Sequence, residues 1–170
     1  LSTKAIAERA EVDNKQRAIP MQSSAVTDKS YTNRNHRWLV SYPADWKLDD
    51  SDQSVKISKS QAILGIHPIT DVAGKSLDEV ADATVHKWER QMKNVNVVRR
   101  VSRKRVELGG HVEGIAIVHH IGAGQIGQSR KIIVIVKEHG YLIDTETLLA
   151  SWPDYESDFS SIINSFRVLQ

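Results

Sequence analysis

The residues with the clearest potential for metal or acid–base chemistry are seven histidines in a chain of 170 residues. His119 and His120 are adjacent, and neighbouring side chains of a strand point to opposite faces, so the two cannot bind one ion without distortion. Neither a His-x-x-x-His nor a His-Glu-x-x-His spacing occurs. The chain has no cysteine, which excludes thiolate metal sites, iron–sulfur clusters, disulfides and a cysteine nucleophile. The sequence therefore predicts no dedicated metal site.

The serines and the acidic residues form no recognisable catalytic or calcium-binding motif. Ser41, Ser102 and Ser129 fall on expected strands or turns, and no Gly-x-Ser-x-Gly elbow presents a serine to a histidine. Four aspartates between residues 45 and 52 lack the glycine and glutamate positions of an EF-hand, so we expect a solvated acidic loop. No catalytic residue is predicted, and a hydrolase assembled from distant positions is the remaining enzymatic alternative.

One glycine-rich segment, from Gly122 to Gly127, matches the Gly-x-Gly-x-x-Gly pattern of dinucleotide-binding sites. Such a site needs a helix N-terminus directly after the glycines, because free N–H groups and the helix dipole bind the pyrophosphate. Residues 129–137 have the apolar pattern of a strand instead. We therefore expect a flexible hairpin at this position and no cofactor.

The most distinctive charged feature is a basic stretch formed by Arg99, Arg100, Arg103, Lys104 and Arg105. Between residues 85 and 107, eight Lys and Arg residues stand against two Glu residues, so this region carries +6 although the whole chain carries +2. Regular strand alternation would place the three odd-numbered arginines on one face with Val101, and Arg100 and Lys104 on the other.

Charge on both faces of a strand is typical of an exposed edge strand, where it also prevents aggregation. The same cations would suit an acidic protein partner or an anionic surface. Single-stranded nucleic acid is not expected as a partner, because no aromatic side chain is interleaved with them. A solvated edge and a partner-binding patch both stay open, and the five cations are the candidate binding residues.

Hydrophobic periodicity predicts the elements that would position these residues. Alternating apolar residues indicate short strands near residues 38–42, 55–57 and 63–66. Ser76, with Glu79 three residues later, has the pattern of a capping box at the start of a helix, and apolar residues then recur every three or four positions to Met92.

The second half of the chain repeats this arrangement of strands followed by a helix. Glycine-bearing turns separate four expected strands, which predicts antiparallel hairpins over 95–108, 111–121, 127–137 and 141–148. Pro153 begins a C-terminal helix whose apolar residues also recur at helical spacing. This order predicts an α+β fold, an αβα sandwich with a central antiparallel sheet of six or seven strands flanked by helices.

The chain divides into two parts by composition. Residues 1–30 are polar, with few large apolar residues, and predict a flexible N-terminal segment. Residues 31–170 predict a single α+β domain. Since no cysteine is present to take a lipid, we expect any lipid anchor to lie upstream of Leu1.

Four sequence elements in this order resemble the PsbP-like family, named for an extrinsic protein of photosystem II. They are Tyr42-Pro43-Ala44-Asp45-Trp46, Ser76-Leu77-Asp78-Glu79, Leu108-Gly109-Gly110 and Ile162-Ile163-Asn164-Ser165-Phe166-Arg167. The resemblance extends from Tyr31 to Val168. It implies the αβα sandwich that this family shares with a Ran-binding release factor and with bacterial envelope proteins.

The resemblance also implies a function, although fold alone does not determine one. PsbP-like proteins are mostly non-enzymatic binding or assembly factors that are exported or lipid-anchored. We therefore expect an extracytoplasmic, envelope-type member that is not an enzyme and that recognises a protein partner or an anionic surface. The alternative is a protein that binds a small ligand or divalent metal in a cleft between the sheet and a helix.

Overall fold

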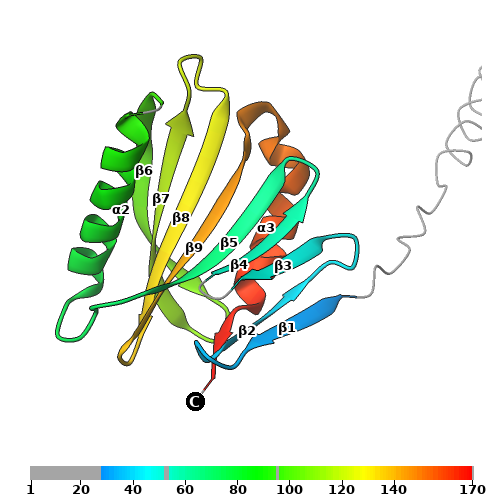
Figure 1. The fold of residues 1–170 in the computed structure, drawn as a ribbon, viewed down its shortest axis with the longest axis vertical. Coiled ribbons are helices and arrows are strands. Elements are labelled where there is room, and N and C mark those ends of the chain that lie inside the picture. Colours follow the sequence, from blue (N-terminus) through cyan, green and yellow to red (C-terminus); the bar gives the residue numbers. More distant parts are fainter. Residues whose placement is uncertain (1–27, 52–53, 95, 170) are drawn as a thin grey trace, which may run out of the picture.

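The computed structural model describes residues 28–51, 54–94 and 96–169, so the prediction for residues 1–27 lies outside the described part of the chain (Figure 1). Its strands are β1 (Lys29–Asn33), β2 (Trp38–Tyr42), β3 (Lys47–Ser51), β4 (Ser54–Lys59), β5 (Ala62–Ile69), β6 (Val98–Leu108), β7 (Val112–Ile121), β8 (Gly127–Val136), β9 (His139–Leu148) and β10 (Arg167–Val168). Its helices are α2 (Leu77–Lys93), the short 3-10 helix η1 (Leu149–Ser151) and α3 (Trp152–Ser165).

Seven strands form one antiparallel sheet in the order β3-β4-β5-β9-β8-β7-β6. Helix α2 covers one face of this sheet over β6, β7 and β8, whereas α3 lies on the opposite face (Figure 1). A small second sheet, β1-β2-β10, packs against α3. The predicted α+β fold, with an antiparallel sheet of six or seven strands between helices, is confirmed, and the sheet has seven strands.

The start of α2 is held by the capping box that the sequence predicts. The Ser76 hydroxyl accepts a hydrogen bond from the Glu79 backbone N–H, and the Ser76 N–H donates to the Glu79 carboxylate at 2.8 Å. These contacts satisfy N–H groups that have no partner within the helix. The helix then buries Val80, Ala81 and Val85 against isoleucines of β7 and β8.

The larger core lies on the α3 side of the sheet and is rich in aromatic residues. Phe159 and Phe166 are fully buried there beside Trp38, Trp46 and Tyr141. The rings of Phe166 and Tyr141 meet edge to face with centroids 5.4 Å apart. Apolar packing on both faces explains why the central run of β8 is apolar at nearly every position.

Two short strands were not expected before α2, where the structure has five strands rather than three. β3 includes Asp49 and Asp50, so the prediction that these aspartates lie in a loop is wrong. Leu48 is the only large apolar residue of β3, and an edge strand with so little buried surface shows no alternation. β1 begins at Lys29, inside the segment expected to be flexible.

The glycine-rich segment behaves as a hairpin. It joins β7 to β8 as a turn, and the residues that follow Gly127 form a strand paired on both sides. The helix N-terminus that a dinucleotide site requires is therefore not in place after it.

Candidate functional site

The predicted basic stretch lies on β6, the outermost strand of the large sheet. A register shift between Arg100 and Ser102 leaves Val101 as an extra residue, and this side chain is 46% exposed. The shift changes the faces that regular alternation predicts. Arg100 shares the α2 face with Arg103 and Arg105, whereas Arg99 and Lys104 lie on the α3 face.

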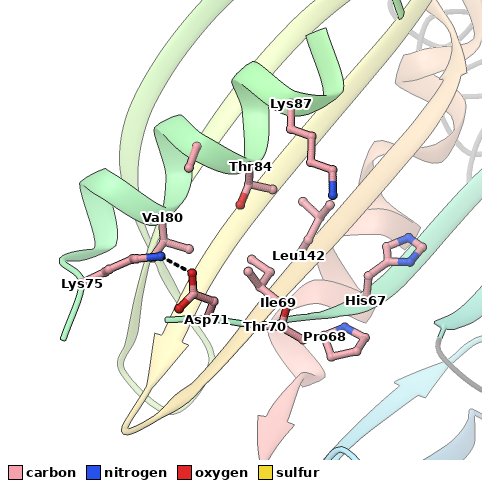
Figure 2. Close-up of a pocket in the computed structure, with 11 residues that line it drawn as sticks. His67, Pro68, Ile69, Thr70, Asp71, Lys75, Val80, Thr84, Lys87 and Leu142 are labelled. Carbon is pink, nitrogen blue, oxygen red and sulfur yellow. Dashed lines mark hydrogen bonds and ion pairs between the residues drawn. The ribbon is translucent and has the colours of Figure 1, made fainter. Parts of the chain in front are cut away.

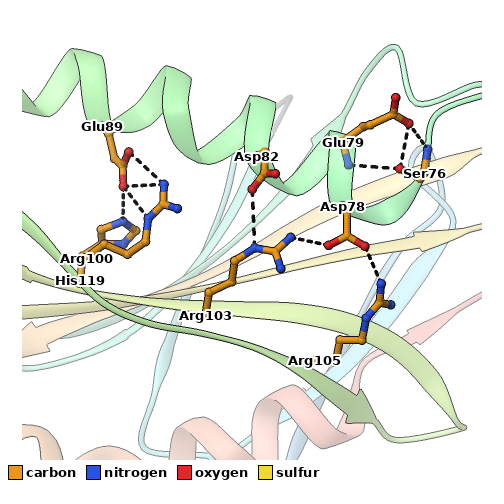
Figure 3. A network of polar contacts seen from close by, with 9 residues as sticks. All are labelled: Ser76, Asp78, Glu79, Asp82, Glu89, Arg100, Arg103, Arg105 and His119. Carbon is orange, nitrogen blue, oxygen red and sulfur yellow. Dashed lines mark hydrogen bonds and ion pairs between the residues drawn. The ribbon is translucent and has the colours of Figure 1, made fainter.

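The arginines on the α2 face are paired with acidic residues (Figure 3). Asp78 lies in the first turn of α2, and Arg103 donates to one of its carboxylate oxygens while Arg105 donates to the other. Arg103 also lies 3.5 Å from Asp82, and Arg105 pairs with Glu113 of β7. The hydrogen bond from Arg103 and the charge of Arg105 lower the pKa of Asp78. These contacts join the helix to the sheet edge.

The third arginine on this face joins a buried histidine through a shared carboxylate (Figure 3). Arg100 donates from Nε and Nη2 to the two oxygens of Glu89, at 3.0 and 3.1 Å. His119 is fully buried and its Nε2 lies 2.8 Å from the same carboxylate, whereas its Nδ1 has no partner. Burial lowers the pKa of His119 more strongly than Glu89 raises it. The imidazole is therefore neutral near pH 7.

The two cations on the α3 face differ, since Arg99 and Lys104 are exposed and neither forms an ion pair within the described residues. Arg130 of β8 lies on the same face, two strands away from Ser102. Its guanidinium is 5.2 Å from the centre of the Trp152 ring, and burial lowers its pKa. The basic residues of β6 thus form two sets, and the pair on the α3 face, Arg99 and Lys104, has no ion pair within the described residues.

A buried polar cluster that the sequence analysis missed lies beneath α2. Lys131 is fully buried and donates to Asp144 at 2.7 Å and to Ser129 at 3.0 Å. Its ammonium is 3.8 Å from the centre of the Trp88 ring, a cation–π contact with the helix. Ser129 donates in turn to Asp144 at 3.0 Å. A lysine within the apolar run of β8 is the signal that could have located this cluster.

A cleft of about 320 Å³ opens beside this cluster, between α2 and the ends of β5 and β9 (Figure 2). Ile69, Val80 and Leu142 form its apolar wall. Lys87 and His67 contribute polar groups to its lining. Burial lowers the pKa of His67, so this ring is also neutral near pH 7. The cleft has the position that the small-ligand alternative requires.

The candidate metal and serine residues can be compared with the geometry directly. Within residues 28–51, 54–94 and 96–169, no three His, Asp or Glu side chains are placed to hold a metal ion. The Ser129 hydroxyl contacts Lys131 and Asp144 rather than a histidine. No helix in the described part of the chain is long and apolar enough to cross a membrane.

Comparison with solved structures identifies the fold. The cyanobacterial PsbP protein (CyanoP) of Synechocystis sp. PCC 6803 matches with a TM-score of 0.68 over 86% of this chain and 95% of that chain, at 11% identity. The chain has a PsbP-like fold. A protein of unknown function from Pseudomonas aeruginosa, PA94, matches this PsbP-like chain with a TM-score of 0.50 over 81% of it and 94% of the other chain, at 13% identity.

No protein-family model and no curated protein matches the sequence. LpqN of Mycobacterium tuberculosis, which is involved in cell envelope biogenesis, superposes on the PsbP-like chain with a TM-score of 0.45 at 9% identity, over 88% of each chain. At 11% identity, the match to CyanoP establishes the fold alone. The resemblance stated from the sequence motifs is confirmed at the level of fold.

Proposed function

We propose that the protein is a non-catalytic PsbP-like binding domain of an exported or envelope-associated protein, and that it recognises an acidic protein partner. The observation that carries this proposal is the pair of exposed cations on the α3 face of β6, Arg99 and Lys104, which have no ion pair within the described residues. Cations without internal partners are free to meet an anionic surface, and complementary charge speeds association.

The other three arginines of the stretch are weaker candidates for partner contacts, because their ion pairs occupy them. Arg100, Arg103 and Arg105 are held by carboxylates of α2 and β7. A partner would have to displace those carboxylates before it could bind these arginines. Reversing the charge of all five residues would therefore damage the fold and the binding surface together.

Pull-down of partners from native extract tests the proposal. The experiment compares the wild type with two variants that change the net charge by the same amount. Arg99→Glu/Lys104→Glu reverses the free cations, and Lys47→Glu/Lys56→Glu reverses two exposed lysines near the opposite edge of the sheet. We expect the first variant to lose acidic partners that the wild type and the second variant retain. Equal recovery by all three proteins would contradict the proposal.

The cellular location is a separate part of the proposal and has its own test. It rests on the PsbP-like fold, since PsbP-like proteins are mostly exported or lipid-anchored. Fractionation of native cells, followed by detection with an antibody raised against residues 31–170, should find the protein in the extracytoplasmic fraction. Detection in the cytoplasmic fraction alone would overturn this part.

The cleft beneath α2 favours a second candidate function, the binding of a small ligand. Its volume of about 320 Å³ lies within the usual range for ligand sites, and its lining combines apolar residues with Lys87 and His67. A thermal-shift screen of small metabolites should reveal stabilisation that Thr84→Trp, which fills the cleft, abolishes. If no compound stabilises the wild type, the cleft is not a ligand site.

A further inference from the structure

A different cavity, of about 220 Å³, lies at the end of the molecule where three turns meet β10. Its lining includes four groups that are cationic or can become so, contributed by Arg37, Lys137, His139 and Arg167. No Asp or Glu of the described residues lines it. Glu138, between two of these residues in the chain, lines a neighbouring cavity instead. Positive charge without a lining carboxylate distinguishes this cavity from the ion-paired face of α2.

Hydrogen bonds fix the backbone of the turn that carries Arg37 and the side chain of Arg167. The Leu169 N–H donates to the Arg37 carbonyl at 2.7 Å, which fastens the β1–β2 turn to the residue after β10. The Arg167 Nη1 donates to the carbonyls of Asn164 and Phe166 at 2.7 and 2.8 Å. A Cβ at Gly109 would lie 2.4 Å from that nitrogen, so glycine leaves room for the guanidinium. The Arg167 guanidinium, which lines the cavity, is therefore held in a fixed position.

Two of the three turns place a cation at a backbone conformation that does not favour a long side chain. Arg37 has a φ of 58° and Lys137 a φ of 57°, both in the left-handed region that glycine and asparagine adopt more readily. Lys137 occupies a two-residue hairpin turn, where Asn-Gly is the favoured sequence. Neither side chain forms an ion pair within the described residues. At each of these two positions a charged side chain thus stands where the backbone favours another residue type.

We propose that this cavity binds a phosphate group, either as free phosphate or as part of a small phosphomonoester. Two guanidinium groups and an ammonium match the charge of a phosphate dianion better than the charge of a single carboxylate. The paired N–H groups of a guanidinium also match the spacing of phosphate oxygens. Val112, Val136 and Val168 add an apolar wall that suits the organic part of an ester. This site is separate from the free cations of β6 and from the cleft beneath α2.

Isothermal titration calorimetry at constant ionic strength tests the proposal with sodium phosphate and glycerol 3-phosphate. Sedimentation with phosphatidylcholine vesicles containing phosphatidic acid tests whether the phosphate belongs to a lipid headgroup. The variant Arg37→Asn/Lys137→Asn removes two charges and suits the positive φ angles, so it should fold at least as stably as the wild type. Its matched control, Arg34→Asn/Lys56→Gln, removes two exposed cations that do not line the cavity.

We expect the wild type and the control to bind at least one of the three probes, and the cavity variant to bind it at least about tenfold more weakly, since each lost charge-assisted bond weakens affinity about tenfold. Binding to the vesicles alone would assign the phosphate to a lipid headgroup. If the double variant does not fold, the single variants Arg37→Asn and Lys137→Asn replace it. Each should bind the probe about tenfold more weakly than the wild type does. Absence of binding to all three probes would overturn the proposal, and so would equal binding by the cavity variant.

Discussion

At the scale of single residues, the least expected feature is a lysine ammonium buried beneath a helix. The positive charge of Lys131 is stabilised by the Asp144 carboxylate, the Ser129 hydroxyl and the face of the Trp88 ring. A buried charge is tolerated only when partners replace the water that it loses. The region is therefore destabilised when one member of the ion pair is left without the other.

Removal of one member of this pair should be costly, whereas removal of both should not. We expect Asp144→Ala to lower the free energy of unfolding by about 3 kcal/mol, because it leaves the buried Lys131 charge unpaired. Lys131→Met/Asp144→Leu should stay within about 1 kcal/mol of the wild type. Urea denaturation measures both values. Lys75→Ala breaks the exposed pair with Asp71 and should change stability by less than about 0.5 kcal/mol. A loss as small for Asp144→Ala would contradict this account.

The buried His119 should make the stability of the fold depend on pH. Burial lowers its folded pKa below 6.5, although Glu89 opposes this shift and Lys131 and Arg100 add to it. As the pH falls below 6.5, the unfolded chain takes up a proton that the folded chain excludes, so the free energy of unfolding decreases. We expect His119→Gln to weaken this decrease between pH 6.5 and the folded pKa, with the remainder due to His67.

Urea denaturation at a series of pH values measures this effect. His86→Gln, which replaces an exposed histidine, is the control and should keep the pH dependence of the wild type. An unchanged pH dependence in the His119→Gln protein would show that His119 is not the group responsible. The contacts of Glu89 affect the free energy of unfolding at lower pH than His119 does. The reason is that the hydrogen bonds from His119 and Arg100 lower the pKa of Glu89 in spite of its partial burial.

At the scale of elements, β6 combines two features that oppose pairing of its free edge with another strand. It carries cations on both faces, and the bulge at Val101 interrupts the regular ladder. Natural sheets protect their edges in this way because an exposed edge offers unpaired N–H and C=O groups to other chains. The same bulge determines which arginines reach the carboxylates of α2.

Deletion of Val101 should restore a regular edge without changing the pairs on either side of it. Arg100 would still lie opposite His119, and Ser102 opposite Val118. We expect a folded protein that self-associates more readily, seen by light scattering after size-exclusion chromatography at increasing concentration. A deletion variant that stays as monodisperse as the wild type would show that charge alone protects the edge.

At the scale of the whole molecule, the C-terminal segment joins the two sheets. Phe166 directly follows α3 and is fully buried between Trp38 of the small sheet and Tyr141 of the large one. The next two residues form β10 beside β2. The small sheet therefore depends on contacts with the last part of the described chain.

Truncation of Phe166 should destabilise the whole fold rather than one end of it. We expect Phe166→Ala to lower the free energy of unfolding by about 3–5 kcal/mol, because it leaves a cavity between the layers. The loss should appear equally in tryptophan fluorescence and in far-UV circular dichroism. Leu148→Ala, at a side chain that is 43% exposed, should change stability little. Unfolding of the small sheet in a separate, earlier transition would contradict this prediction.

The features that could be predicted from the sequence are those set by contacts along the chain. The capping box at Ser76, the glycine turns that join β6 to β7 and β7 to β8, and the apolar stripe of α3 are local patterns, and each appears in the structure. The turn expected at His139 and Gly140 is wrong, since both residues lie in β9 and the turn precedes them. The edge position of β6 followed from charge on both of its faces. β1 and β3 were missed because short edge strands with little buried surface lack a periodic signal.

What only the tertiary structure decided is which side chains meet. One extra residue at Val101 changes the faces on which the cations of β6 lie, because side-chain direction alternates from residue to residue and strand register depends on the partner strand. The pairing of β8 with β9 brings Lys131 to Asp144. The cavity with Arg37, Lys137 and Arg167 draws on segments from both ends of the described chain. Local sequence determined the elements of this protein, but its sites depend on register and packing between distant segments, which no local pattern encodes.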